Sequence, residues 1–144
     1  MSHDEELRSR LSFELGQIQR EIDLIVRLLG EPGRLGPDEI KVRAAAGSLH
    51  AIYNGIEKMI TFAVERKGIA VPRGEASHSE LLQLARSSGT ITGALEDQLK
   101  PYLGFRHFYR HSYGFMIDNE LLNPLLQRVE SVVSQLAGEL LVEP

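Results

Sequence analysis

Arg106 and His111 are the two residues of this chain whose types and spacing best suit catalysis. A histidine has an unperturbed pKa of about 6.5, so its imidazole can both accept and donate a proton near neutral pH. An arginine keeps its charge and presents a planar fork of N–H donors to phosphate oxygens. Such a pair can cleave RNA without a metal. His111 would move the proton of the 2′-hydroxyl or of the leaving oxygen, and Arg106 would stabilise the charge on the phosphorane.

The segment around these two residues has an unusual composition. Between Gln98 and Ile117 there is no Asp or Glu, although the whole chain has 20 acidic and 16 basic residues. Aromatic residues are interleaved with the bases there: Tyr102, Phe105, Phe108, Tyr109, Tyr113 and Phe115. Positive charges beside aromatic rings suit the phosphates and bases of a nucleic acid. The sequence therefore predicts a local RNA contact, to which His107 and Arg110 would add phosphate-binding groups.

The spacing of Arg106 and His111 constrains how they can meet. On an ideal helix, residues five positions apart are separated by about 140° of rotation, so the two would not share a face. A common site therefore requires either a break in the helix, for which Gly104 and Gly114 would serve, or a second subunit related by a two-fold axis.

Two other interpretations of this segment remain open. In the structural one, the Phe residues pack in the core, the Arg residues are solvated and the His residues have no chemical role. In the metal-binding one, His107 and His111 share a helical face, as two zinc ligands do. Phe108 occupies the place of the Glu in His-Glu-x-x-His, so no metal site is predicted.

The pattern Arg106-x4-His111-x-Tyr113 resembles the active-site motif of HEPN ribonucleases, and specifically of the HepT toxins, which pair with an MNT-type nucleotidyltransferase antitoxin. The resemblance implies a homodimeric, metal-independent endoribonuclease that is the toxin of a toxin–antitoxin pair. Many HEPN nucleases have Asn directly after the motif Arg, where this chain has His107. Some HEPN domains cut nothing and bind a nucleotide or substrate for a nucleotidyltransferase, which is the alternative function.

Tyr113 carries a separate expectation. In HepT, the resemblance implies, the Tyr of the motif is modified with AMP by the partner transferase, and this silences the toxin. An AMP group beside His111 would add bulk and a negatively charged phosphodiester where the RNA phosphate should lie, and Arg106 would pair with it. The alternative is that Tyr113 only packs or donates a hydrogen bond through its hydroxyl.

Apolar residues at spacings of three and four predict amphipathic helices along most of the chain. The predicted helices span 7–29 and 37–67, and three more start at Ser77, at Thr90 or Thr92, and at Asp118 or Asn123. The sequence therefore predicts an all-α antiparallel bundle of four to five helices in a single domain, residues 1–144, which is the architecture of HEPN domains.

A polar strip interrupts the apolar face of the second predicted helix. His50, Tyr53, Asn54 and Glu57 lie near one another at helical spacings. We expect the last three to line a cleft or a second subunit, or else to form a half-buried polar strip without chemistry.

Three local signals concern the ends of the later helices. Ser77 precedes Glu80 by three residues, which predicts a capping box at the start of the third helix. His78 lies in that first turn and is expected to be structural or solvated. Pro101 predicts that the fourth helix ends or kinks nearby, because the proline ring clashes with the carbonyl four residues earlier.

Composition limits the remaining possibilities. The absence of Cys excludes disulfides and thiolate zinc sites and suits a reducing cytoplasm. A net charge of −4 argues against a broad nucleic-acid coat, since that binding depends on neutralising phosphates. The first residues are acidic, and no apolar run approaches the roughly 18 residues of a membrane span. We expect a cytoplasmic protein without a cofactor, whose RNA contact is local.

Overall fold

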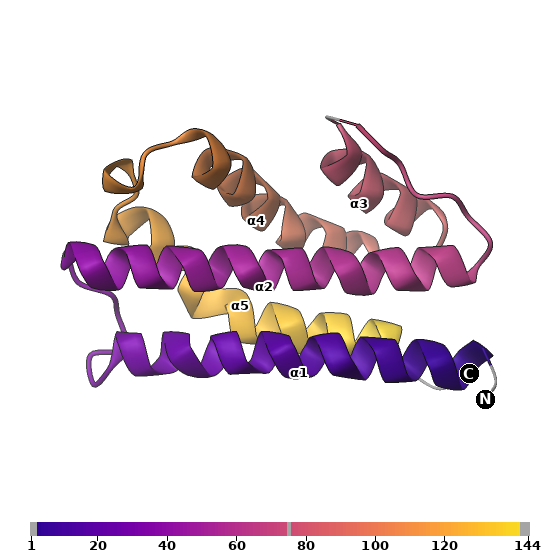
Figure 1. The fold of residues 1–144 in the computed structure, drawn as a ribbon, viewed down its shortest axis with the longest axis horizontal. Coiled ribbons are helices and arrows are strands. Elements are labelled where there is room, and N and C mark those ends of the chain that lie inside the picture. Colours follow the sequence, from indigo (N-terminus) through magenta and orange to yellow (C-terminus); the bar gives the residue numbers. More distant parts are fainter. Residues whose placement is uncertain (1–2, 75, 142–144) are drawn as a thin grey trace.

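Residues 3–74 and 76–141 are described by the structure, a computed structural model. Within these residues all regular structure is helical: α1 (His3–Leu29), α2 (Glu39–Arg66), α3 (Ser77–Ser87), α4 (Gly93–His111), the 3-10 turn η1 (Gly114–Met116) and α5 (Asn119–Leu140). The two longest helices, α1 and α2, run side by side, and α3 and α4 form a second layer over α2 (Figure 1). The predicted all-α bundle is confirmed.

The long pair α1 and α2 packs closely because one residue at their contact has no side chain. A Cβ added at Gly55 would lie 2.7 Å from Cγ1 of Ile18. The apolar stripes of both helices are fully buried there, with Ile18, Ile22 and Ile56 at 2% exposure or less. The motif helix α4 packs against α2 and α5.

A buried amide fixes the loop between α1 and α2 to the last helix. The Asn123 side chain accepts a hydrogen bond from the Leu35 backbone N–H and donates one to the Leu35 carbonyl, both at 2.9 Å. Asn119 donates to the same carbonyl at 3.1 Å. Asn123 is therefore a buried clamp inside α5 and not the cap at which that helix begins.

Side-chain caps mark the starts of α2, α4 and α5. Asp38, Thr92 and Asp118 each accept a hydrogen bond from the backbone N–H three residues later. These bonds satisfy N–H groups that have no partner inside the helix. Thr92 and Asp118 were among the predicted caps, whereas the second helix starts at Glu39, two residues beyond the expected Pro37.

The predicted capping box is wrong, and of the two outcomes predicted at Pro101, a helix end does not occur. No capping box forms at α3, because Ser77 is already its first helical residue and the cap position is Ala76, which makes no side-chain cap bond. The Ser77 N–H instead bonds to the Gly74 carbonyl at 3.2 Å, which draws Ser77 into the preceding turn. Pro101 does not end the fourth helix, which continues for ten residues to His111. The buried side chains of Tyr102 and Phe105 hold this second half of α4 on the core.

The helices α3 and α4 form a hairpin whose closed end is held by an ion pair. Arg86 of α3 lies 3.5 Å from Glu96 of α4, whose carboxylate is buried. At the same end, Glu139 of α5 accepts hydrogen bonds from the backbone N–H and the hydroxyl of Thr92, both at 2.8 Å.

None of the described helices combines the length and apolar character that crossing a membrane would require.

Candidate active site

The motif residues lie on the second half of α4, which is helical without interruption from Gly93 to His111. The chain becomes extended only at Ser112, so neither Gly104 nor Gly114 breaks the helix between Arg106 and His111. The two side chains therefore leave one continuous helix about 140° apart. Within one subunit they face different surroundings, and of the two predicted routes to a common site, the helix break is excluded and a second subunit remains.

Arg106 points toward α2 and α3. Its Nε is buried and has no hydrogen-bond partner among the described residues. Its charge acts on two residues of α2, because it lowers the pKa of His50 and opposes the rise in the pKa of Tyr53. Arg106 also lines a cavity of about 430 Å³ between α3 and α4, together with His78, Ser79, Lys100, Leu103, Gly104 and His107.

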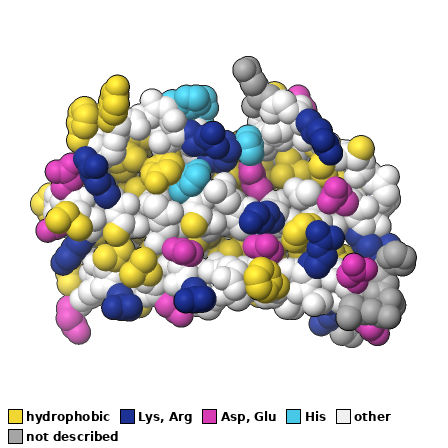
Figure 2. Space-filling model, in the orientation of Figure 1, with side chains coloured by type: hydrophobic (Ala, Val, Ile, Leu, Met, Phe, Trp, Pro, Cys, Tyr) yellow, Lys and Arg dark blue, Asp and Glu magenta, His cyan; other side chains and the backbone are white. Residues whose placement is uncertain are grey.

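His107 connects the Arg106 cavity with His111. The rings of His107 and His111 lie 4.5 Å apart, as the helical spacing of four residues predicts. Both side chains are exposed. His107 lines the cavity whereas His111 lies beyond it, at the last residue of α4. Figure 2 shows that His and Lys or Arg side chains gather over α2, where the surface is hollowed between α4 and α3.

The α2 residues beneath this surface form a buried polar group. Tyr53 is fully buried and its hydroxyl has no hydrogen-bond partner in the described part of the chain. Burial raises the pKa of Tyr53, and the nearby negative charge of Glu57 raises it further. Tyr109 of α4 stacks on the His50 ring at 4.5 Å, in space that Gly47 leaves open. Burial lowers the pKa of His50, and Arg106 and then Arg110 add to this effect.

Glu57 makes the contact that the sequence did not reveal. Its Oε1 lies 2.7 Å from Nδ1 of His78, which comes from the first turn of α3. Glu57 is 8% exposed, and the His78 side chain is 34% exposed. The two residues are 21 positions apart, and no spacing rule joins residues of different helices. The one signal in the sequence was that Glu57 lies on a strongly apolar helix. A carboxylate that becomes buried there requires a hydrogen-bonding or charged partner.

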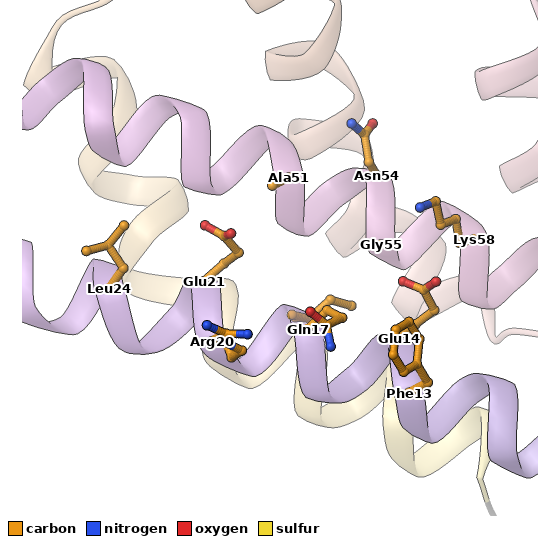
Figure 3. Close-up of a pocket in the computed structure, with 11 residues that line it drawn as sticks. Phe13, Glu14, Gln17, Arg20, Glu21, Leu24, Ala51, Asn54, Gly55 and Lys58 are labelled. Atoms are coloured by element: carbon orange, nitrogen blue, oxygen red, sulfur yellow. The ribbon is translucent and has the colours of Figure 1, made fainter.

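The three predicted cleft residues of α2 lie in different environments in the structure. Tyr53 is in the core, while Glu57 and Asn54 both line a cavity of about 400 Å³ beside His78. Asn54 also borders a larger groove of about 630 Å³ between α1 and α2. That groove contains none of the motif residues, and both acidic and basic side chains from the two helices border it (Figure 3).

Tyr113 lies just after α4 and is 74% exposed. Its ring stacks on Phe115 with centroids 5.7 Å apart. The other three tyrosines are less accessible, because Tyr53 and Tyr102 are buried and Tyr109 is half-buried against His50. The loop that carries Tyr113 lies against α2, since a Cβ added at the next residue would approach the Arg43 guanidinium to 3.1 Å.

Among residues 3–74 and 76–141, no three His, Cys, Asp or Glu side chains are grouped so that they could hold a metal ion.

Comparison with known proteins bears on the segment that contains this site. No curated protein and no solved structure matches the chain. The family model described as HepT-like protein matches residues 44–142. The match includes most of α2 and all of α3, α4 and α5, and therefore every motif residue. The chain belongs to the HepT-like family.

Proposed function

We propose that this chain is a metal-independent endoribonuclease and the toxin of a cytoplasmic toxin–antitoxin pair. His111 is the general acid or base, Arg106 stabilises charge on the phosphate, and His107 and Arg110 contact neighbouring phosphates. The observation that carries this proposal is the HepT-like match across the segment that holds Arg106, His111 and Tyr113 in register. The acid-free segment around them gives further support, because no residue between 98 and 117 has a carboxylate side chain that would repel RNA.

The continuous α4 supports a homodimer as the active form. Arg106 and His111 of one subunit face different directions, and a two-fold axis near the end of α4 would set His111 of one subunit opposite Arg106 of the other. Exposed apolar side chains at this end of the molecule are available for such a contact: Ile40, Tyr113, Phe115, Met116 and Leu121. The segments that carry them, the α4–α5 loop and the starts of α2 and α5, lie at the same end of the molecule (Figure 1).

Silencing of the toxin would act through Tyr113. An MNT-type nucleotidyltransferase antitoxin would transfer AMP to the Tyr113 hydroxyl, with release of pyrophosphate from ATP. The 74% exposure of Tyr113 supports this choice among the four tyrosines. The attached phosphodiester would lie close to the histidine pair and compete with RNA for the same positive charges.

A second candidate function has one observation in its favour. A HEPN domain that only binds a nucleotide or substrate for a nucleotidyltransferase needs phosphate contacts but no shared catalytic pair. The separation of Arg106 and His111 within one subunit is compatible with that role. Cleavage distinguishes the two functions, because a binding partner leaves RNA intact.

The test is incubation of RNA with the wild-type protein and with His111→Ala, both in the presence of EDTA. His111 is exposed, so its replacement should leave the helical content unchanged by circular dichroism. We expect cleavage by the wild type and loss of roughly 10²–10⁴-fold in rate for the variant, the usual contribution of a general acid or base. Equal cleavage by both proteins, or cleavage that the chelator removes, contradicts the proposal.

A further inference from the structure

In the Glu57–His78 pair, the carboxylate orients the histidine ring so that its second nitrogen can contact a ligand. Glu57 is 8% exposed and lies 2.7 Å from His78 Nδ1, so its carboxylate accepts the Nδ1–H hydrogen bond and fixes the ring. A buried carboxylate that holds one ring nitrogen sets the tautomer and orientation of the other. The free nitrogen, Nε2, lies on the side of the ring away from Glu57.

His78 borders the cavity between α3 and α4 that Arg106 also lines. The side chains around this cavity are almost all hydrogen-bond donors or cations: His78, Ser79, Lys100, Arg106 and His107. Among residues 3–74 and 76–141, no carboxylate lines it. Lys100 has Asp97 at 3.5 Å on the neighbouring turn, but Asp97 lies outside the cavity. A surface of this composition suits a ligand that supplies only acceptor oxygens.

Arg106 adds an independent reason to expect an anion. In the part of the chain that the structure describes, no carboxylate lies within ion-pair distance of its guanidinium, and its buried Nε lacks a hydrogen-bond partner. A partly buried cation without a counter-charge is costly unless a ligand supplies the charge. The half of α4 that carries Arg106 contains no carboxylate that could supply this charge.

We propose that the cavity between α3 and α4 binds a phosphate group of RNA, and that His78, positioned by Glu57, contacts this phosphate together with Lys100 and Arg106. The identity of the ligand as RNA rests on the proposed ribonuclease function, whereas phosphate binding can be measured without it. The cavity lies within one subunit and is complete without a partner. It adds α3 to a site that the motif alone would confine to α4.

Binding can be tested with two probes that do not require cleavage. Inorganic phosphate is titrated while the His78 ring resonances are followed by NMR, with acetate at the same ionic strength as a comparison anion. A 2′-O-methyl RNA oligonucleotide, which has no free 2′-hydroxyl to attack the phosphate, is titrated by fluorescence anisotropy. We expect saturable binding of both phosphate probes and a weaker response to acetate.

Three variants test which residues are responsible. Lys100→Gln removes a cavity charge, and Glu57→Gln keeps the shape of the positioning residue but removes its charge. Lys100→Gln should weaken binding of the oligonucleotide roughly tenfold, the effect of losing one charge-assisted hydrogen bond. Glu57→Gln should also weaken it, because the carboxylate no longer holds the His78 ring in the orientation that contacts the phosphate. Lys41→Gln removes an identical charge from the exposed start of α2, 16 residues from Glu57 and about 24 Å away along the helix, and should change affinity less than about twofold.

Unfolding curves by circular dichroism accompany each variant, because Glu57 is buried. If Glu57→Gln fails to fold, His78→Gln takes its place, since His78 is one-third exposed. Wild-type affinity in the Lys100 variant, an equal loss in the Lys41 variant, or no saturable binding of either phosphate probe overturns the proposal. Acetate binding as tight as that of phosphate would assign the cavity to acidic peptides and would also overturn it.

The two proposals fail in different ways. If the wild type cleaves RNA and the KM is unchanged in Lys100→Gln and His78→Gln, the ribonuclease stands and the phosphate cavity is wrong. If the cavity binds the blocked oligonucleotide and unmodified RNA is never cut, the reverse holds. A rise in KM with little change in kcat is the result expected for a residue that binds the substrate equally in the ground state and the transition state.

Discussion

The two histidines that flank the Arg106 surface are held in opposite ways. His78 is fixed by a buried carboxylate on another helix, while His111 stands exposed at the end of α4 and contacts the exposed His107 ring. The first region is a formed cavity between two helices. The second is an open surface that continues into the exposed side chains of Tyr113, Phe115 and Met116.

This difference indicates which function one subunit can perform alone and which one requires a second subunit. A preorganised site loses little conformational entropy when a ligand binds. An exposed imidazole is shielded from water and held in one orientation only when a second surface covers it. We therefore expect the α3–α4 cavity to bind phosphate in an isolated subunit, and the His111 end to become catalytic on assembly.

Mixing two inactive variants would give the largest effect. Arg106→Ala and His111→Ala should each lower the cleavage rate roughly 10²–10⁴-fold. If each site combines Arg106 of one subunit with His111 of the other, a mixture of the two proteins forms heterodimers that contain one intact site. Activity should then return to at most about a quarter of the wild-type value.

The measurement is RNA cleavage after the variants have exchanged subunits, with size-exclusion light scattering to confirm the dimer. Each variant incubated alone for the same time is the control. A mixture as inactive as its components would place both residues in one subunit and remove the contrast between the two regions.

The second effect concerns the exposed region only. Tyr113→Phe should prevent transfer of AMP by the cognate nucleotidyltransferase and ATP, and the variant toxin should remain active when the antitoxin is present. Tyr109→Phe is the matched control, because Tyr109 is half-buried against His50 and should not be the acceptor. Mass spectrometry locates the adduct, and an AMP group on Tyr109 or Tyr102 instead would contradict the assignment.

The third effect is on stability. Asn123→Ala removes two hydrogen bonds at 2.9 Å and leaves the Leu35 N–H buried without a partner. We expect the free energy of unfolding to fall by about 2–3 kcal/mol, measured by urea denaturation. Asn119→Ala, which loses one bond to the same carbonyl, should cost about 1 kcal/mol.

The same Asn123 variant tests whether the Tyr113 region and the His78 cavity are structurally independent. Asn123 holds the end of the bundle near the α4–α5 loop. Glu57 lies farther along α2, where it contacts His78 of α3. NMR shifts should therefore change around Tyr113 and remain constant at His78. Changes of equal size at both places would mean that the two regions are not structurally independent.

The smallest effect is electrostatic and involves His50. Arg106 lowers the pKa of His50, so Arg106→Ala should raise that pKa toward its ordinary value of 6.5, as followed by NMR titration. Because the folded pKa is lowered, the unfolded chain binds a proton more readily, and His50 makes stability fall as the pH drops below about 6.5. The variant should lose part of this acid sensitivity. Arg110→Ala should act in the same direction and more weakly, since the charge of Arg110 lowers the pKa of His50 less than that of Arg106 does.

Sequence reasoning succeeded for most signals that lay within one helix, and the capping box at Ser77 is the exception. The apolar spacing that ends at Leu29 matches the end of α1, and Thr92 and Asp118 were among the expected caps. The 140° separation of Arg106 and His111 likewise needs only the helical repeat and an unbroken helix. Local geometry determines each of these features, so the sequence contains enough information to predict them.

Features that depend on another helix were not predicted in detail. His78 was expected to be structural or solvated, but its partner could not be named, because only the packing of α3 on α2 brings Glu57 to 2.7 Å. Pro101 was expected to end or kink α4, and the helix does not end there, because the buried side chains of Tyr102 and Phe105 beyond it hold the next turns on the core. The predicted α2 strip divided for the same reason, since each face of the helix meets a different neighbour.

The ion pair between Arg86 and Glu96 has a consequence for the cavity at the opposite end of the hairpin. The Glu96 carboxylate is 5% exposed, and swinging α3 away from α4 would strand this charge in a poorly hydrated place. The distance between the walls that carry His78 and Lys100 thus depends on a contact several turns away from the cavity. A substitution of Arg86 would change the width of that opening without altering any side chain that lines it.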